Sequence, residues 1–169
     1  MKIFIRVLLL FFALTVLSLG VSYMLSGGQV EIVNTVQINK SPYEVFDYIS
    51  DMRNELKWNP DVQYMEKKSA GPVEVGTVFR AKWHKSDTID VTITQYYPPY
   101  SVTFQNGGPL EVTLLLQLFK TGEQTKLESR FTAIPHGFLR AIFPVVKSQI
   151  KSREKENMIN LKKALERNG

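Results

Sequence analysis

The chain has no cysteine and only two histidines among its 169 residues. Without cysteine it can form neither a disulfide nor a thiolate nucleophile, and cysteine-based metal sites are excluded. The sequence also lacks an HExxH zinc motif, a GxSxG hydrolase motif and a glycine-rich phosphate loop. It therefore gives no support to a zinc hydrolase, an α/β-hydrolase or a P-loop enzyme, and we expect neither a metal nor a cofactor.

Charged side chains are absent from Val7 to Val30, although Lys2 and Arg6 directly precede this stretch. Its most apolar part, Val7–Leu25, would span about 28 Å as a helix, close to the ~30 Å hydrocarbon core of a bilayer. A buried core helix usually shows a polar stripe. Few polar residues interrupt this run: Thr15, Ser18 and Ser22. We therefore expect contact with a membrane through residues 7–25.

This segment has two interpretations, a permanent signal anchor or a cleaved signal peptide. Small-x-small triplets that suit cleavage occur at 18–20 and at 26–28. The apolar residues continue past Gly20 to Leu25, however, and Tyr23 is typical of a membrane interface. These features favour the anchor.

The basic flank predicts the orientation. Lys2 and Arg6 lie on the short N-terminal side, so the N-terminus should remain in the cytoplasm and the rest of the chain should lie outside it. The alternative is a protein secreted after cleavage. In either case we expect residues 1–28 to be the anchor or signal peptide with a short linker, and residues 29–169 to form one domain.

The formal net charge of +5 is modest. Part of it lies between Lys147 and Arg167, which hold seven basic and three acidic residues. Such a segment is either a solvated helix face or a basic face that is attracted to anionic lipid headgroups. Nucleic-acid binding calls for a larger basic surface interleaved with aromatic residues, so we expect no nucleic-acid partner. The oligomeric state stays open.

The pattern after the apolar segment begins with a strand and two short helices. The strand covers Glu31–Ile38, which is rich in β-branched residues. Ser41 and Glu44 flank Pro42 in the spacing of a capping box, which predicts a helix start. A second short helix should cover Met52–Trp58, with Asp51 as its cap.

Strands and one long helix complete the chain. Alternating apolar residues predict strands at 62–68, 77–84, 89–97, 100–105, 111–120 and 124–133. The links are too short for crossovers, so the sheet should be antiparallel. An apolar stripe predicts a helix over Phe138–Arg167, which Pro144 either begins or kinks. The fold class is α+β: a curved sheet of about seven strands wrapped on the C-terminal helix.

A sheet curled around one helix tends to enclose an apolar space, which is a natural ligand site. The large apolar side chains expected on the inner faces are the candidate lining residues. They are Phe46, Ile49, Trp58, Phe79, Trp83, Phe104, Phe131, Phe143, Val146 and Ile150.

Several landmarks resemble a known superfamily. These are the run Val36–Asp51, the triplet Trp58-Asn59-Pro60, and the later Gly76–Phe79 and Ile93–Pro99. Together they resemble the START-like, or SRPBCC, helix-grip proteins, and most closely their polyketide cyclase/dehydrase-like branch. The resemblance implies the helix-grip fold over the soluble part. It leaves the function open, because the superfamily includes aromatase/cyclases, lipid carriers, plant hormone receptors and pollen allergens. Some bacterial members also carry one N-terminal membrane helix.

Three functions are consistent with these features. The leading hypothesis is a membrane-anchored module, not an enzyme, that binds a hydrophobic small molecule or lipid. The alternative is an enzyme like a polyketide cyclase or dehydratase, which needs a buried ionisable side chain facing the cavity. The third is a structural domain that associates through Leu115 and Phe119 on the outer sheet face.

The sequence identifies no catalytic residue. His84 alternates with basic residues on the polar face of its strand, and His136 lies in a loop before the long helix. We expect both to be surface residues.

Overall fold

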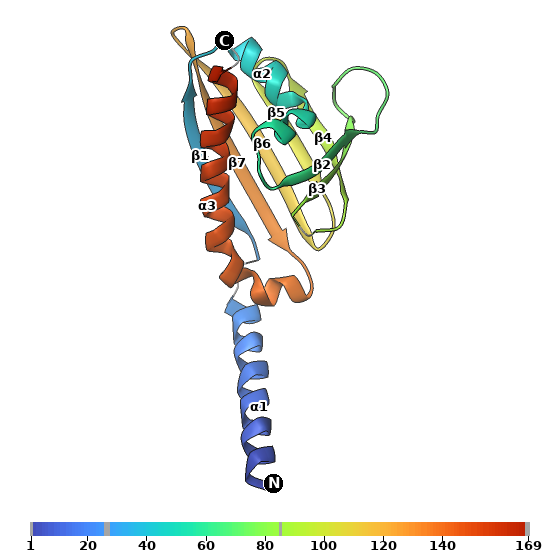
Figure 1. The fold of residues 1–169 in the computed structure, drawn as a ribbon, viewed down its shortest axis with the longest axis vertical. Coiled ribbons are helices and arrows are strands. Elements are labelled where there is room, and N and C mark those ends of the chain that lie inside the picture. Colours follow the sequence, from blue (N-terminus) through green and yellow to red (C-terminus); the bar gives the residue numbers. More distant parts are fainter. Residues whose placement is uncertain (1, 26–27, 85, 168–169) are drawn as a thin grey trace.

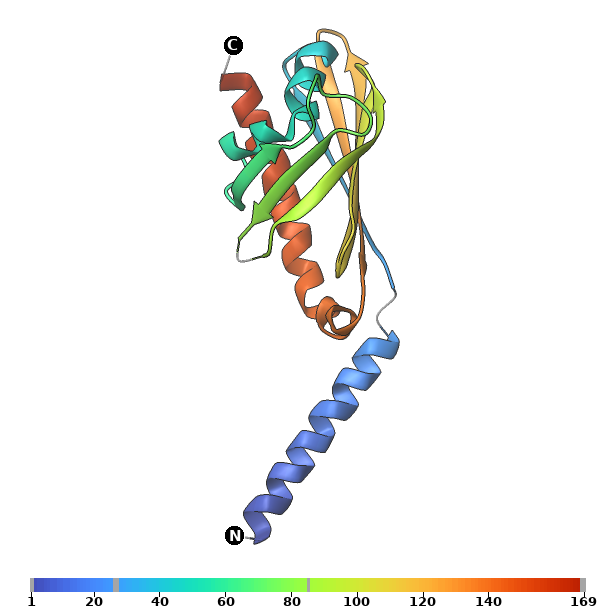
Figure 2. The same cartoon turned by 90° about the vertical axis from the view of Figure 1, so that its right-hand side faces the viewer.

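The computed structural model describes residues 2–25, 28–84 and 86–167. One antiparallel sheet of seven strands has the order β1-β7-β6-β5-β4-β3-β2. Its strands are β1 (Val30–Ile38), β2 (Val62–Lys67), β3 (Val78–Trp83), β4 (Ile89–Tyr97), β5 (Ser101–Asn106), β6 (Leu110–Thr121) and β7 (Gln124–Pro135). The sheet curls around α3 (Phe138–Arg167), as Figures 1 and 2 show. The predicted fold class and element order are confirmed.

Alternating burial explains why these segments are strands. In β1, Val30, Ile32 and Ile38 are buried toward the helix, while Glu31 and Val33 are exposed on the other face. The 12-residue strands β6 and β7 form a long hairpin in continuous register.

Two short helices close one end of the sheet. Helix α2 (Pro42–Ser50) begins with the predicted capping box, in which Ser41 and Glu44 bond to each other's backbone N–H. The next segment, η1 (Met52–Lys57), is a 3₁₀ helix capped by Asp51. Its six residues make about two turns at 3.0 residues per turn, and i→i+3 bonds suit so short a helix.

Helix α3 crosses the concave face of the sheet. Its buried residues are Ala141, Phe143, Met158, Leu161 and Leu165. Pro144 lies inside the helix, and the first turns run at an angle to the remainder (Figure 1). A proline inside a helix removes one hydrogen bond and clashes with the preceding turn, which accounts for this bend.

The buried apolar residues form two clusters rather than one. The larger lies under α2, η1 and the C-terminal half of α3, and includes Phe46, Phe79 and Leu161. The smaller joins Val30, Ile32, Ala133 and Phe143 near the start of α3. The gap between these two clusters is where the cavity described below lies.

Helix α1 (Lys2–Leu25) extends away from the domain at the end where α3 begins (Figures 1 and 2). Ser22 Oγ donates a hydrogen bond to the Ala141 carbonyl at 2.9 Å, and the Arg140 guanidinium lies 4.8 Å from the centre of the Tyr23 ring. The stretch Ile3–Tyr23 is long and apolar enough to cross a membrane, a property that a signal sequence shares.

Candidate functional site

A cavity of two connected chambers lies between the sheet and α3. The inner chamber has a volume of about 140 Å³ and reaches under η1. The outer chamber, of about 560 Å³, lies between α3 and the turns that follow β3 and β5. Seven of the described residues line both chambers and form the boundary, or passage, between them. They are Asn59, Trp83, Asn106, Val112, Phe131, Glu154 and Asn157.

Seven of the ten predicted lining residues lie on this cavity. Ile49, Trp58, Trp83, Phe104 and Phe131 line the inner chamber. Trp83 and Phe131 also line the outer chamber, together with Val146 and Ile150.

The other three predicted lining residues lie in the packed core instead. The rings of Phe46 and Tyr96 meet edge-on, with centroids 5.1 Å apart. Phe79 is fully buried beneath the sheet, and Phe143 belongs to the smaller cluster. These three residues therefore do not line the cavity, and whether any of the ten contacts a ligand stays a prediction.

Glu55 is the first ionisable group inside the cavity. It projects from η1, and its Oε2 accepts a hydrogen bond from Asn59 Nδ2 at 3.3 Å. The indole N–H of Trp83 donates a second bond. Burial raises the pKa of Glu55 to about 7, helped by the negative charge of Glu154 and opposed by the two hydrogen bonds.

Glu154 is the second ionisable group inside the cavity. It lies on α3 at the passage between the chambers. Burial raises its pKa to about 7, and the negative charge of Asp61 adds to the effect. Both glutamates are half-buried, and both line the cavity. The cavity therefore holds two carboxyl groups that titrate near neutral pH.

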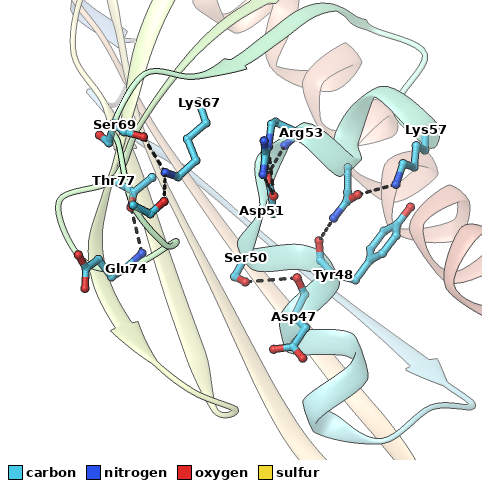
Figure 3. A network of polar contacts seen from close by, with 12 residues as sticks. Asp47, Tyr48, Ser50, Asp51, Arg53, Lys57, Lys67, Ser69, Glu74 and Thr77 are labelled. Atoms are coloured by element: carbon cyan, nitrogen blue, oxygen red, sulfur yellow. Dashed lines mark hydrogen bonds and ion pairs between the residues drawn. The ribbon is translucent and has the colours of Figure 1, made fainter.

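Polar contacts hold η1, the helix from which Glu55 projects, against its neighbours (Figure 3). Asp51 Oδ1 accepts from the Arg53 backbone N–H at 3.1 Å and caps the helix. Asp51 Oδ2 also pairs with the Arg53 guanidinium at 2.6 Å. Asn54 Nδ2 donates to the Tyr48 carbonyl at 2.8 Å, and Lys57 Nζ donates to Asn54 Oδ1 at 2.8 Å. Asp51 is thus a structural cap, as the sequence indicates.

Asp61 ties α3 to the end of β3 at the outer chamber. Its carboxylate oxygens lie 2.6 Å from His84 Nε2 and 2.6 Å from the Arg153 guanidinium. His84 has a positive φ of 46°, a conformation that non-glycine residues seldom adopt. The side chains of His84 and His136 are exposed, and His136 lies 3.4 Å from Glu111.

Neither glutamate is predicted as a site residue from the sequence. A signal for Glu154 was present, because Ile150, Glu154 and Met158 recur every four residues and so place this charge on the apolar stripe of α3. Glu55 gives no such signal. Its segment is a six-residue 3₁₀ helix, too short to show an apolar stripe, and only the folded chain places the side chain on the cavity.

The carboxyl pair suits proton transfer or the recognition of a positive charge. It is not arranged for a metal. Among the described residues there is no group of three or more histidine, cysteine, aspartate or glutamate side chains close enough to hold an ion. Hard cations such as Ca²⁺ call for six or more oxygen ligands.

A family model matches the whole domain and so identifies its family. The model of the family described as "Polyketide cyclase / dehydrase and lipid transport" matches residues 29–166. This chain belongs to that family. No curated protein sequence matches it.

Solved structures share the fold at low sequence identity. A protein from Thermus thermophilus is 12% identical with a TM-score of 0.67, and the match covers 83% of this chain and 99% of that one. The Zhui aromatase/cyclase from Streptomyces sp. R1128 is 12% identical with a TM-score of 0.64, over 82% and 94% of the two chains. The di-domain ARO/CYC StfQ from the steffimycin biosynthetic pathway is 13% identical with a TM-score of 0.66, over 83% and 52%. These similarities establish the helix-grip fold.

We predict that Glu154→Gln changes how stability depends on pH. The pKa of Glu154 is about 7 in the folded chain, against an ordinary value near 4.5. Its contribution to the free energy of unfolding is thus fully present below pH 4.5 and is lost as the pH rises through 7. Glutamine stays neutral, so at pH 8 the variant should be more stable than the wild type by on the order of 1–2 kcal/mol.

Urea unfolding of residues 29–169 at pH 4.5 and pH 8 measures this difference. The two proteins should converge at the lower pH. Glu156→Gln, at an exposed position on the same helix, is the matched control and should change stability little at either pH. Equal stability of wild type and Glu154→Gln at pH 8 would show that Glu154 is solvated.

Proposed function

We propose that residues 29–169 form a binding domain for a hydrophobic small molecule, held at a membrane by α1. The cavity between the sheet and α3 is the observation that supports binding most directly. Its outer chamber, of about 560 Å³, falls within the usual range of ligand pockets. Burying apolar ligand surface there would contribute about 25 cal/mol per Å².

The walls suit a mostly apolar ligand with one polar end. Leu114, Leu116 and Val91 line the inner chamber from the sheet, and Val146 and Ile150 line the outer one from α3. Polar side chains gather instead at the passage, where Asn59, Asn106, Asn157 and Glu154 lie. A ligand that spans both chambers would therefore place its polar group at the passage.

Contact between α1 and α3 supports the tether. The outer chamber is lined by the turns after β3 and β5 and by α3, and these lie at the end of the domain nearest α1 (Figures 1 and 2). Phe138 and Val145, both 73% exposed, lie in the first turns of α3. Lys147 and Lys151 follow on the same helix. Exposed apolar residues beside lysines suit a bilayer interface, so ligand would enter from the membrane side.

Filling the cavity should abolish binding. We expect residues 29–169 to bind the neutral dye N-phenyl-1-naphthylamine with a rise in its fluorescence, because the dye leaves water for an apolar site. Val112→Trp, at the passage, should weaken that binding by roughly tenfold or more. The matched control Leu115→Trp puts the same bulk on the opposite face of β6 and should bind as the wild type does.

Thermal unfolding of both variants checks that they fold. Absence of dye binding by the folded wild type, or equal binding by both variants, would contradict the proposed site.

Because the chain has no cysteine, single introduced cysteines can test the anchor and its orientation by labelling. A single Ser152→Cys on α3 should react with a membrane-impermeant maleimide in intact cells, because the domain lies outside the cytoplasm. Ile3→Cys should react only after the cells are permeabilised. Mass spectrometry of the membrane fraction should find the chain intact from its N-terminus. A chain shortened by cleavage before Gln29 would instead identify a signal peptide.

An acid–base enzyme is the second candidate, and the glutamate pair favours it. A group with a pKa near 7 can both accept and donate a proton at neutral pH. In an aldol cyclisation with loss of water, one carboxylate would remove a proton from carbon between two carbonyls, and that carbon would bond to a further ketone carbon, whose oxygen takes a proton from the carboxylic acid. Removal of the second proton from the attacking carbon and protonation of the new hydroxyl would then release water. Family membership and the aromatase/cyclase neighbours make a poly-β-ketone the substrate class to test.

We predict that, if this enzyme activity exists, Glu55→Gln and Glu154→Gln each lower its rate by roughly a hundredfold and leave dye binding intact. Mass spectrometry of a poly-β-ketone thioester incubated with the protein would detect the loss of one water. Equal product formation by wild type and both variants would rule out catalysis by the pair.

A further inference from the structure

The charges inside the cavity are unbalanced. Among the described residues, the inner chamber is lined by Asp51, Glu55 and Glu154 and by no lysine, arginine or histidine. Asp51 is neutralised by Arg53 at 2.6 Å. Arg153, which lines the outer chamber, is engaged with Asp61 at 2.6 Å. No ion pair in the described part of the chain reaches Glu55 or Glu154.

The two glutamates also differ in their hydrogen bonds. Glu55 accepts from Asn59 and Trp83. Glu154 makes no hydrogen bond with any described residue, although it lies at the passage where both chambers meet. The hydroxyl of Tyr48, which lines the inner chamber, is buried and likewise has no partner in the described chain. A buried polar group without a partner costs free energy unless a bound molecule satisfies it.

Aromatic rings line the same chamber as these carboxyl groups. They belong to Trp58, Trp83, Phe104 and Phe131, and to Tyr48, whose ring already has Lys57 Nζ 5.7 Å from its centroid. The face of an aromatic ring attracts a cation, most strongly in a desolvated site. Carboxylates within an aromatic-walled cavity therefore favour a positively charged group over a neutral or negative one.

A metal ion would not suit this site. Two carboxyl groups supply too few oxygen ligands for a hard cation, and the described residues offer no third ligand beside them. An ammonium group on an organic ligand needs only two or three acceptors and keeps its apolar part within the walls.

We propose that the ligand of this cavity is an amphipathic amine, whose ammonium group lies between Glu55 and Glu154 and whose apolar part fills the chambers. The inference rests on the proposed binding function and names its ligand class. Glu154 supplies the free acceptor, and Glu55, which Asn59 and Trp83 hold by hydrogen bonds, lines the same chamber. The aromatic walls exclude water from the ion pair.

Three probes of similar size distinguish the effect of ligand charge on affinity from the effect of apolar burial. They are hexylamine, hexan-1-ol and hexanoate, which are cationic, neutral and anionic at pH 8. The two tryptophans of the chain, Trp58 and Trp83, both line the cavity. Tryptophan emission of the full chain in phosphatidylcholine nanodiscs therefore reports occupancy of this site and not partition of the probe into lipid.

We expect hexylamine to bind roughly tenfold more tightly than hexan-1-ol, and hexanoate to bind most weakly. In Glu55→Gln/Glu154→Gln, hexylamine should fall to the affinity of hexan-1-ol, while hexan-1-ol binding is unchanged, which also shows that the variant is folded. Glu156→Gln, an exposed position on α3, should keep the preference for the amine.

Two results would overturn the inference, and they differ in what else they reject. Equal binding of hexylamine and hexan-1-ol by the wild type would reject the amine and leave the hydrophobic cavity site standing. No response to any of the three probes would reject the amine together with the proposed binding function.

Discussion

One helix cannot fill the concave face of a seven-stranded curled sheet, and this mismatch shapes the whole domain. Helix α3 supplies Met158, Leu161 and Leu165 to the larger apolar cluster and Phe143 to the smaller one. Between them the helix is too narrow to reach the middle strands. Helices α2 and η1 close one end of the sheet, while the end near α1 stays open. The cavity is what remains, so the same packing that stabilises the domain leaves its interior accessible.

Burying two carboxyl groups in the cavity costs free energy, which the packing of the rest of the fold must offset. A carboxyl group in an apolar space resists ionisation, and a second one beside it resists more. Natural sequences keep such groups chiefly where function needs them. Glu55 is held in place by a network that begins at the Asp51 cap, and Glu154 is held by the packing of α3 on the sheet. Glu55 and Glu154 are thus firmly positioned, and a bound proton or cation would relieve the free-energy cost of burying their charges.

Sequence patterns predicted the fold far better than they predicted the site. The capping box at Ser41, the alternation in β1 and the stripe of α3 are local signals, and each placed its element within a residue or two. Lining a cavity is a property of the assembled fold. Phe79 and Trp83 share a face of β3, yet Phe79 is fully buried in the core while Trp83 reaches the passage. The apolar pattern of the sequence cannot distinguish a core residue from a cavity-lining residue, because both side chains are turned away from bulk water.

The bend at Pro144 connects the cavity to the tether. A straight α3 would continue past the end of the sheet. The bend instead brings Ala141 against Ser22 of α1, so the open end of the cavity and the apolar helix lie at the same end of the domain. The backbone carbonyl of Ala141 makes this contact. The N–H that proline lacks at position 144 would have bonded the carbonyl of Arg140, four residues earlier and next to Ala141. The bend and the contact with α1 therefore lie within the same turn of α3, at the open end of the cavity.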